Sequence, residues 1–265
     1  MKYSLIALSN ALLFSTAFAG IAQRIERRSD RVRSTHPKIP ATGTTDGFDN
    51  ETNVQYSSNW AGAVLTAPPA GTTFNAVSAK FVVPTPSGSG SASAWVGIDG
   101  DTYTNSILQT GLDFTVTNGK VSYDAWYEWY PDYAYDFTGI SFSAGDSVSV
   151  SVKSSSSTAG TAVIENLTTG KTVSKALTST AALGGQNAEW IVEDFEENGS
   201  LVTFADFGAV TFTDATAGYT GGSEGSSGAS LLDIKQSSKV LTSSSLVGSD
   251  EVVINMGWGW GEKEG

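Results

Sequence analysis

Short segments in which apolar and polar residues alternate, separated by tight turns, constrain the fold of this chain most strongly. The clearest segment runs from Val121 to Tyr130. Successive side chains of a strand point to opposite faces, so this period of two predicts a β-strand. One face would carry Val121, Tyr123, Ala125, Tyr127 and Trp129, and the other Ser122, Asp124, Trp126, Glu128 and Tyr130. The first face suits a core. The second sets two acids among aromatics, which is unusual for a strand that only packs.

Segments of the same kind recur along the chain, and none shows a helical stripe. Strands are predicted at Trp60 to Thr66, Phe74 to Val83, Ala92 to Ile98, Ile107 to Val116, Val121 to Tyr130, Ser147 to Lys153, Thr161 to Leu167, Thr172 to Leu177, Glu189 to Phe195, Leu201 to Thr213, Ser230 to Gln236 and Glu251 to Met256. Turns are expected at Asn118-Gly119, Thr169-Gly170 and Gly145-Asp146. The Ser/Gly-rich stretches Ser87 to Ser93 and Ala217 to Ala229 are expected to be loops.

This pattern predicts an all-β fold built as an antiparallel sandwich or barrel. The chain has 265 residues, 40% of them hydrophobic, and 29 glycines to serve its turns. That length is enough for one large domain with a real core. Cysteine is absent, so the stability of the domain must come from burial and sheet hydrogen bonding.

A second alternating stretch, Asn187 to Glu197, threads acids between aliphatic residues. Its acids either belong to solvated strand faces or converge in a cleft with the acids of the Val121 to Tyr130 strand. We interpret them as converging, with Gln109 between the two stretches.

The first 53 residues differ from the rest of the chain. Residues 1–19 have a basic start, an apolar middle and an Ala17-Phe18-Ala19 end, which predicts a cleaved secretory signal. Residues 20–53 are polar and basic, and we interpret them as a pro-segment removed after secretion; the alternative is a disordered arm that stays attached. Residues 54–265 would then form the catalytic β-sandwich domain of a secreted, extracellular protein.

Charge is distributed unevenly along the chain. The formal net charge is −12, yet residues 1–50 hold seven of the 15 basic residues and only four of the 27 acids, which leaves a net of −15 for the remainder. A surface this acidic argues against nucleic acid as a partner. It also suggests that the basic pro-segment docks over an acidic cleft and acts as an intramolecular inhibitor. No stretch after residue 19 is long and apolar enough to span a membrane.

The residue types present in the chain exclude most of the common catalytic mechanisms. The only histidine is His36, in the expected pro-segment, so the mature domain can run neither a Ser-His-Asp nor a Cys-His mechanism. Asp99-Gly100-Asp101 offers oxygen ligands for calcium, but its spacing matches no full binding loop, and we expect neither a metal nor a cofactor. Paired carboxylates allow glycoside hydrolysis or acid proteolysis. Trp95, Trp126 and Trp129 would fit a sugar platform or a peptide cleft, or simply the core.

Several sequence blocks occur in an order that resembles one known family. They are NWAG at Asn59 to Gly62, WVGIDGDT at Trp95 to Thr102, ILQTG at Ile107 to Gly111, YDAWYEWYP at Tyr123 to Pro131, ENLTTG at Glu165 to Gly170 and EWIVEDFEE at Glu189 to Glu197. Together they resemble the glutamic peptidases, or eqolisins, which are secreted acid proteases of fungi. The resemblance implies a jelly-roll-like sandwich of two large curved antiparallel sheets and a catalytic dyad of Gln109 and Glu193. It places Trp95, Asp99, Asp124, Glu128 and Tyr130 near the cleft as supporting residues.

The chemistry of the two side chains agrees with the roles that the resemblance implies. A glutamate can take a proton from water and return it to a leaving amine, which would be the role of Glu193. Gln109 cannot titrate, but its amide can orient the water and donate to the oxyanion. Without the resemblance, a structural amide would be the simpler reading of Gln109. Asp124 and Glu128 are expected to bind each other or the dyad and to share a proton in acid.

The sequence thus predicts a secreted acid endopeptidase, expected to be a monomer, that acts on proteins and peptides. One alternative is a carbohydrate-binding sandwich that uses the same aromatics. Another is a glycosidase with Glu128 and Glu193 as its pair. The Asn-X-Ser/Thr motifs at Asn50, Asn166 and Asn198 are compatible with glycosylation.

Overall fold

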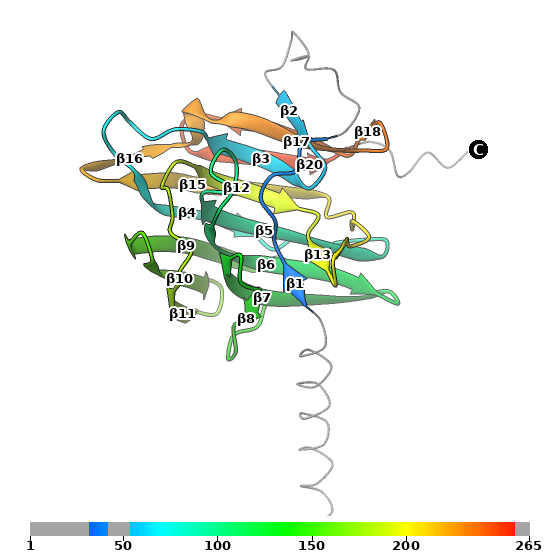
Figure 1. Cartoon of the computed structure of the whole chain (residues 1–265). Helices are drawn as coiled ribbons and strands as arrows, with labels where there is room; N and C mark the ends of the chain where they lie inside the picture. The colour runs from blue at the N-terminus through cyan, green and yellow to red at the C-terminus, as the bar shows by residue number, and fades with distance from the viewer. Residues whose placement is uncertain (1–31, 42–53, 258–265) are drawn as a thin grey trace, which may run out of the picture.

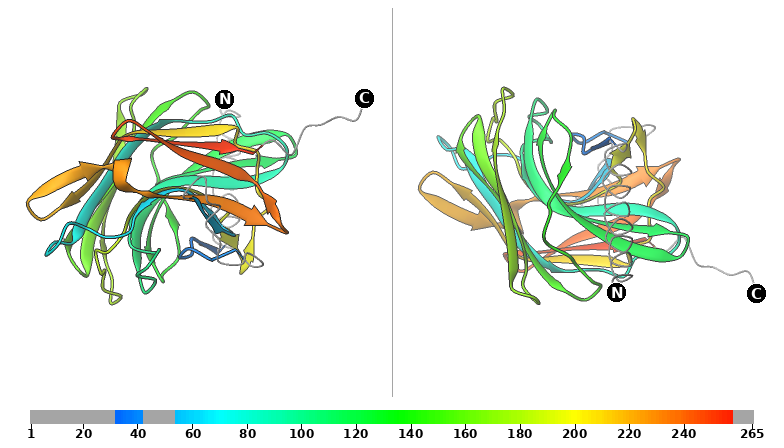
Figure 2. Two further views of the ribbon diagram at one scale, coloured as in Figure 1. Left: turned by 90° about the horizontal axis from the view of Figure 1, so that it is seen from above. Right: turned by 90° about the horizontal axis from the view of Figure 1, so that it is seen from below.

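The computed structural model describes residues 32–41 and 54–257 of the chain. These residues form β-strands and one 3₁₀ turn, Ser226–Gly228, with no α-helix among them. Two large sheets stack as curved layers (Figures 1 and 2). Strand pairs within the layers are antiparallel except for β2 with β17, so the predicted all-β sandwich is confirmed.

One layer is a nine-stranded sheet with the order β18-β17-β3-β12-β5-β6-β7-β8, and β2 pairs with β17. Its strands are β2 (Val54–Ser57), β3 (Trp60–Leu65), β5 (Gly90–Ile98), β6 (Ile107–Thr117), β7 (Lys120–Tyr130), β8 (Tyr135–Asp136), β12 (Ala188–Glu193), β17 (Ser230–Gln236) and β18 (Lys239–Val240).

The other layer is an eight-stranded sheet with the order β11-β10-β9-β4-β15-β20-β19, and β16 pairs with β15. Its strands are β4 (Phe74–Val82), β9 (Ser147–Ser156), β10 (Ala159–Asn166), β11 (Lys171–Thr178), β15 (Ala209–Tyr219), β16 (Gly222–Gly225), β19 (Thr242–Val247) and β20 (Glu251–Met256). A small third sheet joins β1 (Arg33–Ser34), β13 (Glu196–Glu197) and β14 (Ser200–Leu201).

The main core lies between the two layers and is filled by alternate residues of their strands. In β12, Ala188, Trp190 and Val192 belong to this core. The residues between them point to the opposite side of the nine-stranded sheet, which we call the site face. A second buried cluster lies there, made of Trp60, Val64, Trp95, Ile107, Trp126, Ile191 and Leu232.

The hairpin of β6 and β7 has the turn that the sequence predicts. Asn118 and Gly119 both have positive φ, 53° and 72°, which matches the right-handed twist of the flanking strands. The hairpin pairs Thr117 with Lys120 at its turn and Ile107 with Tyr130 at its far end. This long, unbroken register fixes which residues of the two strands lie side by side.

One predicted strand and two predicted loops need correction. The predicted strand Leu201 to Thr213 is interrupted, because β14 ends at Leu201 and β15 begins only at Ala209. The predicted loops are also partly strand: β5 begins at Gly90, and β15 and β16 form a hairpin within Ala217 to Ala229. Small residues serve there both in strand and in turn, and Ser91 and Ser93 are even buried, so composition does not distinguish these strands from a loop.

The glycosylation motifs differ in their surroundings. Asn166 is buried, and its Nδ2 donates to the Ser141 carbonyl at 3.0 Å and to Asp146 Oδ2 at 2.8 Å. Asn198 is exposed in the turn between β13 and β14. Asn50, the predicted signal at residues 1–19 and the tail 258–265 lie outside the described residues.

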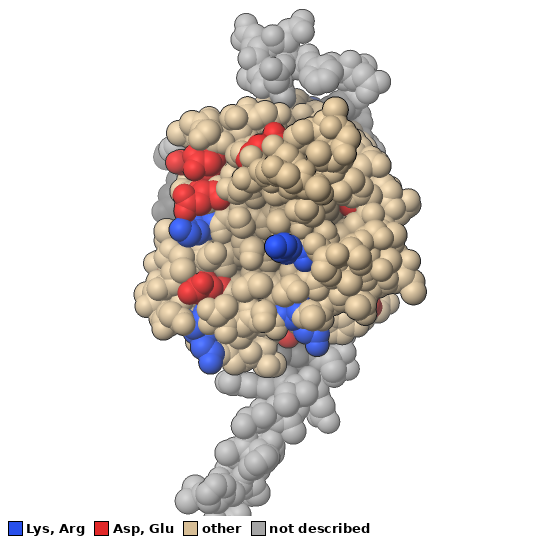
Figure 3. Space-filling model, turned by 90° about the vertical axis from the view of Figure 1, so that its left-hand side faces the viewer, with Lys and Arg blue, Asp and Glu red and all other residues tan. Residues whose placement is uncertain are grey.

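Charged side chains are sparse on the surface shown in Figure 3, and the basic ones on that face lie apart rather than in one patch. Within the described residues no helix is long and apolar enough to cross a membrane.

Candidate active site on the outer face of the nine-stranded sheet

The register of four adjacent strands sets the geometry of the site face. Residues paired across β12, β5, β6 and β7, in that order, form rows on this face. The first row is Glu189, Gly97, Gln109 and Glu128, and the second is Ile191, Trp95, Gly111 and Trp126. The third row is Glu193, Ser93, Asp113 and Asp124. Opposed residues of paired strands share a face. The acids of the two alternating stretches therefore lie on one face, with Gln109 between them.

Two glycines on the site face let the large side chain of Trp95 lie directly against the backbone of the sheet. A Cβ on Gly111 would lie 2.5 Å from the Cβ of Trp95 and 2.4 Å from the Ala94 carbonyl oxygen. A Cβ on Gly97 would lie 2.8 Å from Trp95 Cζ3 and 3.0 Å from Glu189 Oε1. The Trp95 ring consequently spans the rows that hold Gln109 and Glu193.

Glu193 is fully buried at the end of β12, and both of its oxygens accept hydrogen bonds. Oε2 accepts the Trp95 indole N–H at 2.9 Å, and Oε1 accepts Asn59 Nδ2 and the backbone N–H of His36, both at 3.3 Å. Burial raises the pKa of Glu193 well above its ordinary value, although Arg33 and these N–H donors act to lower it. With residues 32–41 in place, the carboxyl group therefore holds its proton more tightly than an exposed glutamate and keeps a fixed orientation.

Gln109 is fully buried on β6, and neither atom of its side-chain amide has a hydrogen-bond partner among the described residues. Buried amides are normally paired, because an unpaired one costs free energy. Glu189, two strands away in the same row, has two unpartnered oxygens as well. The described contacts include no direct hydrogen bond between Gln109 and Glu193. An amide left free in this way is available to a water molecule or a bound ligand.

Residues 32–41 lie on the site face and bring a buried cation to its acids. Arg33 donates from Nε to Asp113 Oδ2 at 2.5 Å and from Nη2 to Asp113 Oδ1 at 2.7 Å, and its Nη1 lies 3.8 Å from Glu128 Oε2. Its guanidinium carbon lies 4.0 Å from the ring centroid of Trp126 and 4.4 Å from that of Phe195. In Figure 1, β1 lies in front of β6 and β7, the strands that carry Asp113, Trp126 and Glu128.

The same segment is held along its whole length. Val32 and Arg33 accept backbone hydrogen bonds from Asn198 and Ala134, and β1 pairs with β13. Lys38 forms an ion pair with Asp101, and its backbone N–H donates to the Gly100 carbonyl at 3.0 Å. The segment therefore spans the site face with anchors on both sides of Glu193.

Burial also raises the pKa of the other acids that face Arg33. The pKa of Asp113 is raised to about 6 by desolvation, which outweighs the lowering effect of Arg33. The pKa of Glu128 is raised to about 8 for the same reason, again against Arg33 and the hydrogen bond from the Thr35 backbone N–H. Asp113 consequently changes charge between neutral and acid pH, whereas Glu128 is already largely protonated at neutral pH.

The supporting residues predicted from the sequence divide into two groups. Trp95, Glu128 and Tyr130 lie with the site: Trp95 donates to Glu193, and the Tyr130 ring lies 5.8 Å from that of His36. Asp124 lies one strand from Asp113 and raises its pKa. The carboxylate of Asp99 instead accepts backbone N–H groups from residues 184–187, at 2.7 to 3.4 Å, and so fixes that loop.

Of the alternatives left open for the three tryptophans, the structure favours burial over an exposed platform. Trp95 and Trp126 are fully buried, and Trp129 is 3% exposed and belongs to the core between the sheets. Residues 32–41 cover part of the face on which Trp95 and Trp126 lie.

Sequence reasoning missed Asp113 and Asn59 as candidate site residues. Asp113 lies four residues after Gln109 on one strand, so the period of two already places both on one face. Asn59 Oδ1 accepts the Ile39 backbone N–H at 2.9 Å, and its Nδ2 contacts Glu193. Asn59 was visible only as the first residue of the NWAG block.

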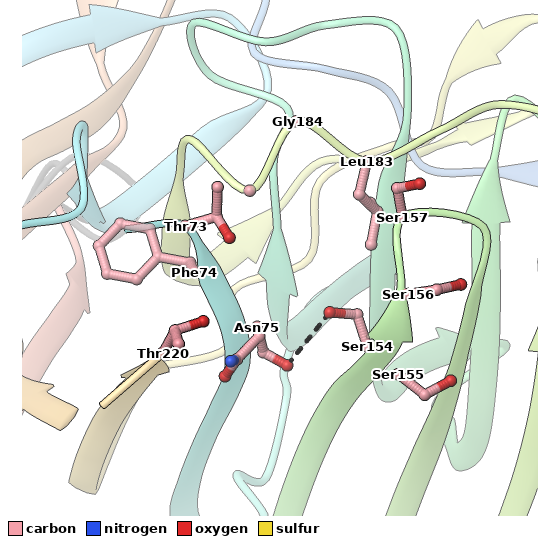
Figure 4. A pocket seen from close by; sticks show the side chains of 11 residues that line it. Thr73, Phe74, Asn75, Ser154, Ser155, Ser156, Ser157, Leu183, Gly184 and Thr220 are labelled. Carbon is pink, nitrogen blue, oxygen red and sulfur yellow. Dashed lines mark hydrogen bonds between the residues drawn. The ribbon is translucent and has the colours of Figure 1, made fainter. Parts of the chain in front are cut away.

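A separate pocket of about 330 Å³ opens beside β4 and β9 (Figure 4). It is lined by Thr73, Phe74, Asn75, Ser154, Ser155, Ser156, Ser157, Leu183, Gly184, Gly185 and Thr220. Ser154 Oγ donates to the Asn75 carbonyl across it at 3.4 Å. None of the lining side chains titrates near neutral pH, so this pocket supplies no acid or base for hydrolysis.

Comparison with known proteins places this geometry among peptidases. Residues 58–256 match the model of the Peptidase A4 family. The chain is 43% identical to aspergillopepsin-2 of Aspergillus niger over 96% of its length and 99% of the relative. It is 42% identical to scytalidopepsin B of Scytalidium lignicola, covering 94% of the chain and 97% of that protein.

Solved structures agree with the sequence relatives. The crystal structure of scytalido-glutamic peptidase with a transition state analog inhibitor superposes with a TM-score of 0.70 at 43% identity, over 75% of this chain and 98% of that one. The crystal structure of aspergilloglutamic peptidase from Aspergillus niger gives a TM-score of 0.61 at 54% identity, over 63% and 98% of the two chains.

Proposed function

The chain belongs to the peptidase A4 family, the glutamic peptidases or eqolisins, and we propose that Glu193 and Gln109 are its catalytic dyad in hydrolysing proteins and peptides at acid pH. The observation that carries this proposal is the hydrogen bond from a peptide N–H, that of His36, to Glu193 Oε1. A carboxyl group in reach of a peptide nitrogen can return a proton to it as the bond breaks. The relatives, named as pepsins and glutamic peptidases, support the same reaction.

In the proposed mechanism Glu193 takes a proton from water, and the water oxygen attacks the substrate carbonyl carbon. Gln109 donates its amide N–H to the oxyanion that forms, a role for which its unpartnered side chain leaves it free. Glu193 then passes the proton to the leaving nitrogen. Trp95 and Asn59 hold the carboxyl group in place throughout through their hydrogen bonds to it.

We further propose that the chain is made with a signal at residues 1–19 and a pro-segment at residues 20–53, and that it is secreted and active as a monomer once the pro-segment is removed. Residues 32–41 would act as an intramolecular inhibitor, because they occupy the site face and bury Glu193. Burial raises the pKa of Glu193, so a smaller fraction of its carboxyl groups is ionised and able to take a proton while the segment covers it.

Acid would loosen this inhibitor. Arg33 lowers the pKa of Asp113 and Glu128, so it binds their ionised forms preferentially. That part of the attraction is present above the pKa of each acid and is lost as the pH falls through it. For Asp113 the loss is centred at about pH 6. Inhibition of matured enzyme by a synthetic peptide of residues 32–41 should therefore weaken as pH falls below about 6, and an Arg33→Ala peptide should inhibit poorly at every pH.

The dyad is tested by proteolysis of a denatured protein across acidic pH, with pepstatin present, using matured wild type and Glu193→Gln. We expect pepstatin-resistant cleavage by the wild type and none by Glu193→Gln. Gln109→Ala should lower kcat by about 10² to 10³, the usual effect of losing an oxyanion donor. Retained cleavage by Glu193→Gln would remove Glu193 from the mechanism, and glycan binding that survives this substitution would favour the carbohydrate-binding alternative.

A further inference from the structure

We propose that Glu189 is a positioning residue, which orients the side-chain amide of Gln109 so that one N–H of that amide faces the substrate. The inference rests on the proposed function, because Glu189 acts through the same Gln109. It gives a role to a buried acid that the proposed mechanism does not use. The burial of Glu189, its lack of partners and its place beside Gly97 support this role.

Glu189 is a carboxyl group at a position where the sheet would accept an apolar side chain. It is fully buried on β12, and neither of its oxygens has a hydrogen-bond partner among the described residues. The residues opposite it are Val64 of β3 and Gly97 of β5, and neither has a side-chain donor. Burying an unpartnered carboxyl group costs free energy that burying a leucine of similar size does not. A polar group buried at such a cost is a candidate for a role other than packing.

Gly97 allows Glu189 and Gln109 to approach each other. The two residues flank Gly97 in one row, Glu189 from β12 and Gln109 from β6. A Cβ at Gly97 would lie 3.0 Å from Glu189 Oε1 and 3.3 Å from Gln109 Cβ. The Glu189 carboxyl group thus occupies the space that a side chain of residue 97 would fill, directly beside the Gln109 side chain. A small rotation of either side chain, or one bridging water molecule, joins the carboxyl group to the amide.

The other two glutamates of the site face already have hydrogen-bond donors. Glu193 accepts N–H groups on both of its oxygens. Glu128, opposite Gln109 on β7, accepts the Thr35 backbone N–H at 3.1 Å. The described contacts of residues 32–41 include no hydrogen bond to Glu189. Its oxygens are therefore available to the Gln109 amide whether or not that segment covers the face.

In acid Glu189 can donate a hydrogen bond as well as accept one. Burial raises the pKa of Glu189 well above its ordinary value, and the carboxylates of Asp99 and Asp101 raise it further. The carboxyl group therefore carries a proton at the acid pH at which the enzyme is proposed to work. Its O–H can donate to the amide oxygen of Gln109, while its carbonyl oxygen can accept one of the two N–H groups of that amide.

A hydrogen bond of this kind decides which way the Gln109 amide points. The oxygen and the nitrogen of a glutamine amide are nearly equal in size, so an amide without a partner can adopt two orientations that exchange these atoms. Only one orientation presents an N–H to the oxyanion of the proposed mechanism. When the amide oxygen of Gln109 accepts the O–H of Glu189, the outer N–H is left for the substrate. The oxyanion donor is then oriented before the reaction begins, as electrostatic stabilisation requires.

The experiment compares Glu189→Gln and Glu189→Leu in matured enzyme, with kcat and KM measured on one peptide substrate at acid pH. Glutamine keeps the shape of glutamate and an N–H donor, so Glu189→Gln should retain most of the activity. Leucine has no donor, so Glu189→Leu should lower kcat about 10-fold, the effect of losing one ordinary hydrogen bond. KM should stay unchanged, because Glu189 does not touch the substrate. Equal kcat values in the two variants would overturn the inference.

A double-mutant cycle shows whether Glu189 acts through Gln109. In a Gln109→Ala background the amide is gone, so Glu189→Leu should have no further effect on kcat. A similar loss in both backgrounds would mean that Glu189 acts on another group, and the inference would fail while the proposed dyad stands. If Gln109→Ala alone leaves kcat unchanged, the proposed function loses its oxyanion donor, and the positioning role is overturned with it.

Thermal unfolding of the same variants separates positioning from a structural role. Glu189→Leu replaces an unpartnered carboxyl group by an apolar side chain, so its melting temperature should equal or exceed that of the wild type. Asp233→Asn changes another buried acid, on β17 of the same sheet, and is the matched control that should leave kcat unchanged. A Glu189→Leu protein that is both slow and clearly less stable than the wild type would show that Glu189 supports the fold, and would overturn the inference.

Discussion

The Glu193 carboxyl group owes its state to a few neighbouring atoms. Two side-chain N–H donors, from Trp95 and Asn59, hold it, while burial opposes its ionisation. The pKa of a buried carboxyl group can therefore be changed by removing one hydrogen-bond donor while the group stays in place. The Trp95 indole lowers the pKa of Glu193 by its hydrogen bond, and this contribution can be isolated from the bulk of the ring.

Trp95→Phe in the matured enzyme should move the acid limb of the kcat/KM profile to higher pH. The substitution removes the N–H that stabilises ionised Glu193, so the pKa of the base rises and a smaller fraction is ionised at a given acid pH. A shift of about one pH unit is expected from the loss of one charge-assisted hydrogen bond. The measurement is kcat/KM on a peptide substrate across acidic pH.

Trp60→Phe is the matched control for that prediction. The Trp60 ring packs edge-on against Trp95, with centroids 5.0 Å apart, but its own indole N–H has no partner among the described residues. Removing it changes packing without removing a donor to Glu193. An acid limb that moves equally in both variants would show that packing, rather than the hydrogen bond, sets the profile.

At the scale of single elements, strands were predictable and registers were not. The alternation in Val121 to Tyr130 and the turn at Asn118-Gly119 located β6 and β7 nearly to the residue. The serine-rich strand β19 was missed because its exposed positions have the composition of a loop. The broken stretch after Leu201 was read as a strand because Phe204 and Phe207 pack on the core from irregular backbone.

For the site as well, the face of each strand was predictable from the sequence, but the neighbours of each strand were not. Period two placed Gln109 and Glu193 each on one face of its strand, and the family resemblance selected them. That the faces coincide depends on β12 lying next to β5, a pairing between residues far apart in the chain. The role of Asp113 depends on Arg33 reaching it from 80 residues away. Neither long-range contact leaves a local trace in the sequence.

Gly111→Ala should destabilise β6 where it passes Trp95. The added Cβ would lie 2.4 Å from the Ala94 carbonyl oxygen, a backbone atom that cannot turn aside. We expect a loss of about 2 kcal/mol or more in the free energy of unfolding, as for other overpacked sites. The measurement is urea unfolding in the Glu193→Gln background, which prevents self-digestion.

Gly218→Ala serves as the control for Gly111→Ala, since it makes the same change in a strand of the other sheet. Its Cβ would meet Ala76 Cβ at 3.2 Å and only side-chain atoms within 3.4 Å. A change within about 1 kcal/mol is expected. Equal losses at the two glycines would mean that the contact with Ala94 is not the cause.

The sequon at Asn198 should be glycosylated in a secreting host, and the one at Asn166 should not. Asn198 lies exposed in a turn, whereas Asn166 is buried and both hydrogens of its Nδ2 are engaged. Peptide mapping with and without glycosidase checks both sites, and Asn198→Gln gives the reference mass. A glycan at Asn166 would require the loop around Ser141 to open when the sugar is added.

At the scale of the whole molecule, the buried acids determine how stability depends on pH. Burial raises the pKa of Glu128 to about 8, of Asp194 to about 7, and of Asp113 and Asp233 to about 6. Each of these groups binds its proton more tightly in the folded chain than in the unfolded one. Their contribution to stability is complete below the unfolded pKa and is lost as the pH rises through the folded pKa.

The melting temperature should therefore rise as the pH falls from about 8 to about 4, which is the opposite of ordinary acid denaturation. Thermal unfolding of the full-length Glu193→Gln protein at several pH values checks this. Asp233→Asn should reduce the change in the free energy of unfolding between pH 4 and pH 6 by about 2 kcal/mol, because an asparagine at this position does not titrate. A melting temperature that falls steadily with acid would contradict the pKa directions on which the prediction rests.

The position of β12 also determines when the protein can become a peptidase at all. This strand is inserted between β3 and β5, which the ribosome makes some ninety or more residues earlier. Pairings between distant segments form slowly, because a long loop must close before any contact stabilises it. A nascent chain that ends before residue 188 holds Gln109 and Trp95 but lacks Glu193 and leaves the sheet open between β3 and β5. Completion of the sheet and completion of the proposed catalytic pair are thus one folding event, so an unfinished chain would lack the proposed base.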